Sequence, residues 1–428
     1  MTGERKILLV AFPGHGLISP SLRFADRLLK MGVSVTFCTC NGLLPIIKET
    51  IPHGLTIAPF SDGHDNGVQP TDTLQQLISD FAKSGSAAVA DLITSAAAKG
   101  QPFDHLVYTT IVPWVANVAN AHNVTSTLLW CQPATVFNIY YYYFNEYQEL
   151  ISSNKNNPLV PIKLPGLPSF FLPSTRNDCE FMLSLYKQHI DVIKTNSSIL
   201  INSFDELENE SIKAIEKIKY IPIGPLIPSE SLEKEEDGII NWLNTKPKKS
   251  VVYVSFVRLS HLSSDQAEEM AKGLLESGRP FLWVIRDSGE AAKLSNIDEL
   301  KKQGMIVDWC SQVAVLNHDA IGCFVTNCGW NSTVEALAAG VPIVAYPQWT
   351  DQGTNAKMIE DVWKIGVRVK KGNVDEVVEG KEIARCVEMV IGDEAISSNA
   401  LKWKELSSKA VQKGGSSSVN LEAFLDDA

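Results

Sequence analysis

The residues best suited to chemistry lie in one stretch between Trp309 and Gln352. Within it, an apolar run at Cys323–Thr326 predicts a buried strand, an Asn-Cys-Gly turn follows, and a helix is expected to begin at residues 330–332. The first turn of a helix leaves backbone N–H groups free and carries the positive end of the helix dipole, and both suit a phosphate group. This strand–turn–helix therefore predicts a phosphate-binding turn.

The elements that must position this turn are alternating short strands and helices. In residues 1–220 the expected buried strands are Lys6–Phe12, Val33–Thr39, Leu55–Pro59, His105–Tyr108, Thr125–Trp130 and Ser198–Ser203, with helical patterns such as Ser21–Met31, Leu74–Ala98 and Glu206–Lys217 between them. A second series has expected strands at Val251–Phe256, Phe281–Arg286, Met305–Val307, Cys323–Thr326, Val341–Tyr346 and Val367–Lys370. Such alternation predicts an α/β fold of doubly wound parallel sheets.

A chain of 428 residues is too long for one ordinary core, so two domains are expected. We predict an N-terminal domain at 1–222, a linker at 223–249 that is rich in Pro, Ser and charge, and a second domain at 250–413. Residues 414–428 are expected to form a final helix that packs back on the first domain. Two facing domains of this kind make a cleft at the carboxyl ends of both sheets, where open α/β folds bind ligands.

Composition and charge narrow the classes of function. The net charge of −11 argues against nucleic acid as the main partner. The sequence shows neither a signal-peptide pattern nor an apolar run of about 18 residues, so we expect a cytoplasmic protein without a membrane span. The eight cysteines are scattered without metal-ligand spacing, which predicts reduced thiols and no metal.

The block from Trp309 to Gln352 closely resembles the signature box of plant family-1 UDP-glycosyltransferases. The resemblance covers essentially the whole chain, because VVYVSF, GRPFLWVIR, GMIVDWCSQ, PSLRFADRLL and LLWCQPATVFNIYYYYFN are also similar to this family. It is closest to the branch that acts on flavonoids, anthocyanins and hormones. The resemblance implies a GT-B fold of two facing Rossmann-like domains, UDP-glucose as co-substrate, a small-molecule acceptor, no metal and a monomeric protein.

The resemblance also implies roles for individual residues of the box. Trp309 would stack on uracil, and the backbone of Cys310 would hydrogen-bond to it. Gln312 and Glu335 would contact the ribose. The expected phosphate contacts are Trp330, Asn331 and Ser332 with their backbone N–H groups, and the expected contacts to sugar hydroxyls are Asp351 and Gln352.

One departure from the family concerns proton transfer. Its catalytic histidine follows the first strand, where this chain has Leu17, which cannot accept a proton. His15 lies two residues earlier and is our candidate for a relocated base. The alternative is that His15 is a solvated or hydrogen-bonding loop residue. The aspartate that orients the histidine in many relatives corresponds to Thr109.

Further departures surround the expected diphosphate. Relatives read VSFGS where this chain has Val257 and Arg258. Val257 adds a branched side chain where glycine allows close backbone approach. Arg258 is a candidate catalytic residue that could clamp a phosphate, or fill the pocket and displace it. Asn327 replaces a histidine expected to touch the β-phosphate; it can donate a hydrogen bond but carries no charge.

The acceptor pocket is expected to come from first-domain loops at Phe60–Gln69, Trp130–Phe144 and Leu164–Tyr186. Four consecutive tyrosines, Tyr140–Tyr143, lie in the second of these segments, and at least two of them are expected to pack in the core. In the first loop, Asp62, His64 and Asp65 form either a solvated loop or a group capable of acid–base chemistry.

Three hypotheses remain open on the sequence alone. The first is transfer of glucose from UDP-glucose to a hydroxyl or carboxyl group of a small plant metabolite, with inversion. The second is a repurposed enzyme that has lost sugar transfer through changes at Leu17, Val257, Arg258 and Asn327, and that catalyses a sugar-free cyclisation, condensation or isomerisation. The third is an inactive ligand-binding paralogue.

Overall fold

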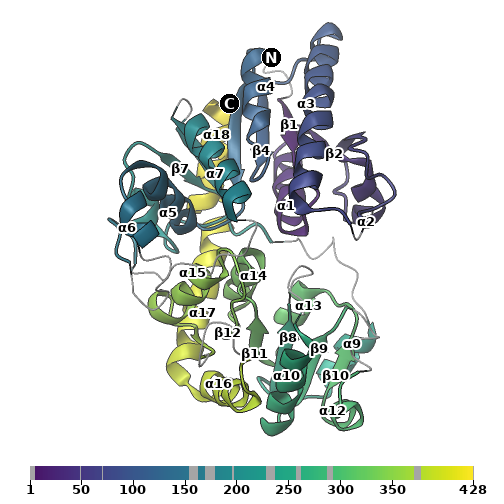
Figure 1. Cartoon of the computed structure of the whole chain (residues 1–428), viewed down its shortest axis with the longest axis vertical. Coiled ribbons are helices and arrows are strands. Elements are labelled where there is room, and N and C mark those ends of the chain that lie inside the picture. The colour runs from purple at the N-terminus through teal and green to yellow at the C-terminus, as the bar shows by residue number, and fades with distance from the viewer. Residues whose placement is uncertain are drawn as a thin grey trace.

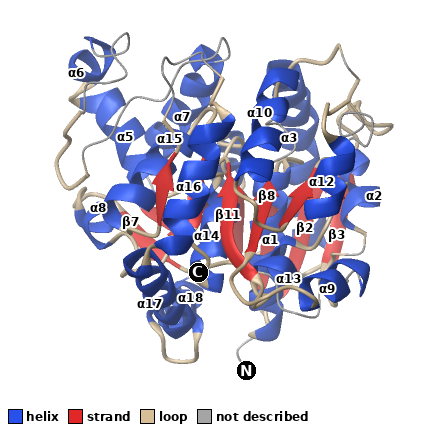
Figure 2. Ribbon diagram, turned by 90° about the horizontal axis from the view of Figure 1, so that it is seen from below, coloured by secondary structure: helices blue, strands red, loops and turns tan. Residues whose placement is uncertain are grey.

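The structure of the chain is a computed structural model, and it describes residues 5–48, 50–69, 71–153, 162–168, 179–194, 197–227, 237–256, 262–286, 293–370 and 377–427. Figure 1 shows two α/β bodies stacked along the long axis, with the C-terminal helix α18 returning to the body that contains the N-terminus. Each body contains a parallel β-sheet with helices packed around it (Figure 2).

The first body is built on a sheet in which the described strands follow the order β3-β2-β1-β4-β5-β6-β7, and every neighbouring pair is parallel. Its strands are β1 (Lys6–Val10), β2 (Ser34–Cys40), β3 (Thr56–Phe60), β4 (His105–Thr109), β5 (Thr125–Trp130), β6 (Ser198–Ile201) and β7 (Lys219–Pro222). Its helices are α1 (His15–Lys30), η1 (Asn41–Leu43), α2 (Leu44–Ile47), α3 (Leu74–Ala98), α4 (Trp114–Ala121), α5 (Ala134–Asn145), α6 (Gln148–Ser153), α7 (Cys179–Ile193) and α8 (Asn209–Lys213).

The second body has a parallel sheet in the order β10-β9-β8-β11-β12-β13 over the described residues. Its strands are β8 (Val251–Ser255), β9 (Phe281–Val284), β10 (Met305–Val307), β11 (Ile321–Thr326), β12 (Ile343–Ala345) and β13 (Gly366–Arg368). The helices are α9 (Asp237–Asn244), α10 (Ser264–Glu276), α12 (Ile297–Gln303), α13 (Gln312–Leu316), α14 (Trp330–Ala339), α15 (Gln352–Lys357), η3 (Met358–Val362), α16 (Gly380–Gly392) and α17 (Glu394–Val411). The last helix, α18 (Ser416–Asp427), packs on the first body.

The strand order reverses between β1 and β4 in the first sheet and between β8 and β11 in the second. Such switch points are where open α/β sheets bind ligands, because the following loops diverge there. Helix α1 follows β1 and helix α14 follows β11, and the Asn331 side chain donates to the Gly16 carbonyl oxygen at 3.2 Å. The carboxyl ends of β1 and β11 therefore face the same interdomain region. The predicted fold class, two facing Rossmann-like domains of the GT-B type, is confirmed.

Each sheet carries a hydrophobic core, and two segments of the chain pack into the core of the other body. Leu421 and Phe424 of α18 are buried in the core of the first sheet. Phe204 and Leu207, which follow β6, are buried in the core of the second. Helix α9 lies inside the expected linker and also packs into the second core. We retain the boundaries 1–222, 223–249, 250–413 and 414–428 as a proposal. Within the described residues, no helix is long and apolar enough to cross a membrane.

Candidate active site

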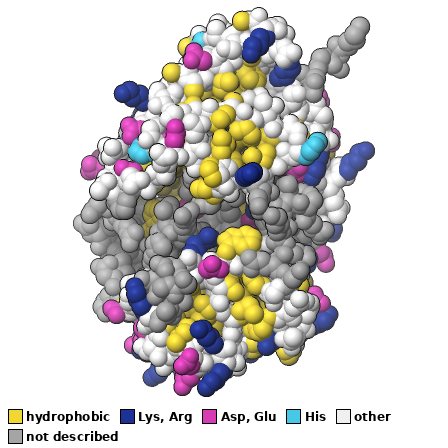
Figure 3. All heavy atoms as spheres, turned by 90° about the vertical axis from the view of Figure 1, so that its right-hand side faces the viewer, with side chains coloured by type: hydrophobic (Ala, Val, Ile, Leu, Met, Phe, Trp, Pro, Cys, Tyr) yellow, Lys and Arg dark blue, Asp and Glu magenta, His cyan; other side chains and the backbone are white. Residues whose placement is uncertain are grey.

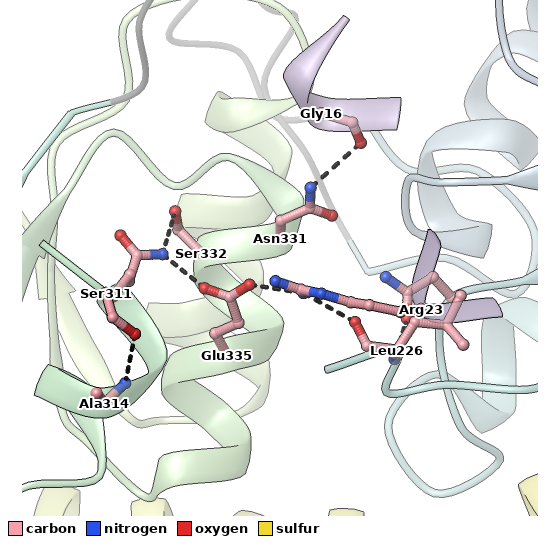
Figure 4. A network of polar contacts seen from close by, with 10 residues as sticks. Gly16, Arg23, Leu226, Ser311, Ala314, Asn331, Ser332 and Glu335 are labelled. Atoms are coloured by element: carbon pink, nitrogen blue, oxygen red, sulfur yellow. Dashed lines mark hydrogen bonds and ion pairs between the residues drawn. The ribbon is translucent and has the colours of Figure 1, made fainter. Parts of the chain in front are cut away.

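The centre of the site is the carboxylate of Glu335 on α14, which is held from two sides (Figure 4). Its Oε1 lies 2.7 Å from Nη1 of Arg23 on α1, and its Oε2 lies 2.7 Å from Nε2 of Gln312. Gln312 Nε2 also lies 3.0 Å from Ser332 Oγ, one turn before Glu335 on the same helix. A carboxylate offers about four lone-pair positions. Glu335 can therefore accept two more hydrogen bonds, as a ribose with two hydroxyls would require.

Gln312 is the first residue of α13, and the local sequence fixes where that helix begins. Ser311 caps the helix, because its Oγ accepts the Ala314 N–H at 3.3 Å. Just before it, Cys310 is buried, with its Sγ 3.4 Å from the Tyr253 hydroxyl. Trp309 instead leaves 44% of its surface exposed, which is high for the largest apolar side chain. It offers a flat aromatic face close in sequence to the Glu335 network.

The turn between β11 and α14 places free backbone donors beside this network. Cys328 adopts a left-handed conformation with φ of 63°, and its carbonyl oxygen accepts from Asn355 Nδ2 at 2.9 Å. Gly329 occupies the N-cap position of α14, where no side chain among the described residues caps the helix. The first N–H groups of this helix are therefore available to an anion. Asn327, the first residue of this turn, is fully buried.

The predicted sugar-binding residues follow β12 and are tied to the same turn. Asn355 Nδ2 also donates to Asp351 Oδ2 at 2.8 Å, and Thr350 Oγ1 donates to Asp351 Oδ1 at 2.9 Å. Burial raises the pKa of Asp351, and hydrogen bonds from Asn355, Thr350 and the first-domain residue Gln132 oppose that rise. Gln352 Oε1 accepts the backbone N–H groups of residues 348 and 349 at 2.9 and 3.1 Å, so a ligand would meet its amide nitrogen.

Trp330 serves the domain interface. Its side chain is buried, and its indole N–H donates to the carbonyl oxygen of Asn202 in the first domain at 2.8 Å. Its ring centroid lies 6.0 Å from that of Trp363. The prediction that Trp330 contacts the donor can therefore hold only for its backbone N–H.

The structure describes only some of the residues predicted to take part in catalysis. His15 is the first residue of α1, and its side chain lies outside the described part of the structure, as do Val257 and Arg258. Leu17 is buried in the first core. Thr109 Oγ1 is buried, and no described residue hydrogen-bonds to it. Neither Leu17 nor Thr109 supplies a group that accepts a proton readily.

His64 holds together a loop beside the expected acceptor region. Its Nε2 lies 3.1 Å from Asp80 Oδ2 on α3, its Nδ1 lies 3.4 Å from Asp72 Oδ2, and its backbone N–H donates to Asp62 Oδ1 at 3.1 Å. The hydrogen bond to Asp80 is the main cause of a raised His64 pKa. Asp65 Oδ2 accepts from Asn41 at 3.3 Å. These contacts tie the loop down, a structural role that the sequence did not predict for this group.

The four consecutive tyrosines of α5 point in different directions around the helix, so they have different surroundings. Tyr142 is buried, and its hydroxyl donates to the carbonyl oxygens of Pro165 and Ala214 at 3.0 and 3.3 Å. Tyr140 stacks on Tyr186 with ring centroids 4.0 Å apart. At least these two pack against neighbouring protein groups.

The surface of one face of the molecule has a hollow at mid-height (Figure 3). Apolar, basic and acidic side chains lie around it.

Sequence reasoning missed the residues that hold the site from a distance. Arg23, Gln132, Asn202 and Asn355 all contact predicted site residues or the turn beside them. The only available signal was Arg23 itself, a cation on the helix that follows the first strand, and nothing in the sequence names its partner. Among the described residues, no three or more His, Cys, Asp or Glu side chains gather as a metal site, and the expectation that no metal is used stays a prediction.

Comparison with known proteins agrees with this geometry. Residues 228–410 match the family described as UDP-glucoronosyl and UDP-glucosyl transferase. The chain is 49% identical to UDP-glycosyltransferase 75C1 of Solanum lycopersicum, over 98% of this chain and 97% of that protein. It is 47% identical to phloretin 4′-O-glucosyltransferase of Malus domestica, over 99% and 98% of the two chains. A crystal structure of Os79 from O. sativa in complex with UDP aligns with a TM-score of 0.86 and 29% identity, covering 98% of this chain and 99% of that one.

Two facing Rossmann-like domains with a nucleotide-type site between them define a GT-B glycosyltransferase. The chain belongs to the plant family-1 UDP-glycosyltransferases, as the resemblance of its signature box implied. It is an enzyme of the transferase class.

Proposed function

We propose that this protein transfers glucose from UDP-glucose to a hydroxyl or carboxyl group of a small plant secondary metabolite, with inversion at the anomeric carbon. The observation that carries the proposal is the Glu335 network: a carboxylate fixed by Gln312 on the helix that follows the exposed Trp309. Proteins named as glucosyltransferases of plant metabolites share nearly half of this sequence along its full length, which supports the choice of sugar and acceptor class.

The donor would bind by contacts that match each part of its chemistry. Trp309 would stack on the uracil ring, and Glu335 would accept from the ribose hydroxyls. The diphosphate would lie at the start of α14, where backbone N–H groups and the helix dipole favour negative charge. Asp351 and Gln352 would contact the sugar hydroxyls. The UDP-bound Os79 supports this placement, because its fold is shared over nearly the whole chain.

Transfer would proceed by attack of the acceptor oxygen on the anomeric carbon, as the bond to UDP breaks on the opposite face. The start of α14 would stabilise the charge that develops on the departing diphosphate. The acceptor proton needs another destination, because Leu17 offers no base. Loss of a general base typically costs ~10²–10⁴-fold in rate. Phenols and carboxylic acids, which lose a proton more readily than alcohols, are therefore the acceptors that we propose, with His15 or water as the proton acceptor.

No observation favours either alternative function. Arg258, a candidate group for sugar-free catalysis, and Val257, one of the changes that would remove sugar transfer, lie outside the described residues. Leu17 is buried in the first core, and Asn327 is buried within a turn that keeps its backbone donors. The complete Gln312–Glu335–Ser332 arrangement supports a donor site, which an enzyme that has lost sugar transfer would not need.

The cellular location, the oligomeric state and the need for a metal stay proposals. We propose a cytoplasmic monomer that acts without a metal and without a nucleic-acid partner. Sedimentation of the purified protein and fluorescence microscopy of a tagged chain would test the oligomeric state and the location. Activity in the presence of a chelator would test the metal.

The deciding experiment is calorimetric titration with UDP and UDP-glucose, followed by an acceptor screen that measures UDP release together with the mass of the glucoside. We expect micromolar binding and stoichiometric release of UDP with product, most readily from phenols or carboxylic acids. Binding of neither nucleotide, or turnover of a metabolite without any nucleotide sugar, would overturn the proposal.

A further inference from the structure

The ion pair between Arg23 and Glu335 joins the two domains inside the candidate donor site. Arg23 lies on α1 of the first domain, and Glu335 lies on α14 of the second. Their side chains are only 11% and 6% exposed, and the charged atoms are 2.7 Å apart. Figure 4 shows the Arg23 guanidinium reaching the Glu335 carboxylate. The carboxylate is thus fixed by one group from each domain.

The position of Arg23 is itself fixed through the first domain. Its Nη1 also donates to the Leu226 carbonyl oxygen at 2.9 Å, and the Leu226 N–H donates to Asn202 Oδ1 at 2.8 Å. Asn202 in turn accepts the indole N–H of Trp330 through its carbonyl oxygen. A chain of buried and partly buried hydrogen bonds therefore connects the segment that leaves the first domain to the carboxylate at the donor site.

Stability alone gives a weak reason for such a pair. Removing two charges from water costs about as much as their attraction returns, so a buried ion pair is often no more stabilising than an apolar contact. Orientation gives a stronger reason. With Arg23 on Oε1 and Gln312 on Oε2, the remaining lone pairs of Glu335 have fixed directions, and preorganised acceptors bind hydroxyls more tightly than mobile ones.

We propose that Arg23 is a positioning residue for the donor nucleoside. It holds Glu335 in the orientation that accepts the ribose hydroxyls, and so makes recognition of the ribose depend on the first domain. The inference rests on the proposed function, because it requires a uridine nucleotide as ligand. It differs from a merely structural role in one respect: it predicts a change in ribose discrimination.

Arg27 provides a matched control on the same helix. It also donates to a carbonyl oxygen of the segment after β7, that of Ile223, and the contacts described for it include no carboxylate of the second domain. Arg27→Gln and Arg23→Gln therefore both remove an arginine bonded to this segment. Only Arg23→Gln also releases Glu335.

The test is calorimetric measurement of the Kd for UDP and for 2′-deoxy-UDP in the full-length protein and in the variants Arg23→Gln, Arg23→Lys, Arg27→Gln, Glu335→Gln and the double variant Arg23→Gln/Glu335→Gln. We expect Arg23→Gln to weaken UDP binding about tenfold and to reduce the preference for UDP over 2′-deoxy-UDP, because a bond to a charged group is lost. Arg27→Gln should keep the preference, Arg23→Lys should restore part of it, and the double variant should resemble Glu335→Gln.

An unchanged preference in Arg23→Gln, or additive losses in the double variant, would overturn the inference while UDP binding by the unsubstituted protein still stood. An unsubstituted protein that binds UDP but forms no glucoside would overturn the proposed function, and the preference would still decide the role of Arg23. An unsubstituted protein that binds no UDP would overturn both.

Discussion

Trp330 and Asn202 join the two domains at the first residue of α14, where the indole N–H donates to the Asn202 carbonyl oxygen across 2.8 Å. The helix whose free N–H groups face the candidate diphosphate position is therefore anchored to the first domain at its own starting point. Asn202 is itself buried, so its carbonyl oxygen depends on this donor. Docking of the two domains and placement of the phosphate-binding turn therefore share this contact.

Replacement of Trp330 by Phe should reduce both stability and donor affinity. The Asn202 carbonyl oxygen would be buried without its partner, which costs about 1–3 kcal/mol in the free energy of unfolding. Trp403→Phe is a matched control, because its indole N–H also donates to a backbone carbonyl, that of Trp363 at 3.1 Å, but within the second domain. Urea unfolding should show a loss in both variants, and calorimetry should show weaker UDP binding only in Trp330→Phe. Equal UDP affinities in the two variants would contradict this anchoring role.

Trp309 should contribute to nucleotide binding with little effect on folding, because 44% of its surface is exposed. Stacking of a base on an aromatic ring is worth about 1–3 kcal/mol, so Trp309→Ala should weaken UDP binding by roughly tenfold or more. Trp309→Phe should retain much of the affinity. Calorimetry and thermal unfolding would measure the two effects separately. A Trp309→Ala variant that binds UDP as tightly as the unsubstituted protein would show that the ring lies away from the base.

Periodicity predicted the fold well because buried parallel strands and amphipathic helices have strong local patterns. Thr125–Trp130, Met305–Val307 and Leu74–Ala98 have the predicted bounds. Strand β7, Lys219–Pro222, was missed because it is short, begins with a charge and ends with proline. Helix α9 was missed because charge and proline around it resemble a linker.

For the site as well, contacts between residues close in sequence could be predicted, and contacts between distant residues could not. Ser332 and Glu335 are one helical turn apart, so a motif can predict that they share a face. Arg23 reaches Glu335 from a position 312 residues earlier, and no local pattern encodes such a pairing. The contact of the Trp330 indole with the first domain could not be predicted either, because docking of the domains determines that Asn202 is its partner.

Replacement of Leu17 by His tests the cost of the missing base. Because residue 17 corresponds to the catalytic histidine of the family, Leu17→His should raise the kcat for alcohol acceptors by about 10²-fold or more and should matter less for phenols. It should also add a pH dependence in which activity rises as imidazole loses its proton. Leu17→Asn controls for polarity without a base. Both variants should lose some stability, because Leu17 is buried. The same kcat and pH profile in the His and Asn variants would place residue 17 away from the proton.

The loop around His64 should make stability depend on pH. The hydrogen bond to Asp80, with the charges of Asp72 and Asp62, raises the His64 pKa above its ordinary value of 6.5. A raised pKa means that the folded state binds the proton more tightly than the unfolded chain does. The stabilisation is therefore complete below pH 6.5 and is lost as pH rises through the folded-state pKa. His64→Gln removes this dependence, so the difference in free energy of unfolding from the unsubstituted protein should shrink as pH rises.

His105 provides a control, because its pKa is shifted in the direction opposite to that of His64. Burial lowers its pKa to about 4, so its contribution is present above pH 6.5 and is lost as pH falls toward 4. Its Nε2 lies 2.9 Å from Thr127 Oγ1, and His105→Gln can keep a polar group at that place. Urea unfolding from about pH 4 to about pH 9 should make the His64→Gln difference largest in acid and the His105→Gln difference largest near neutrality. If both differences followed pH in the same direction, the carboxylates around His64 would not be what fixes its loop.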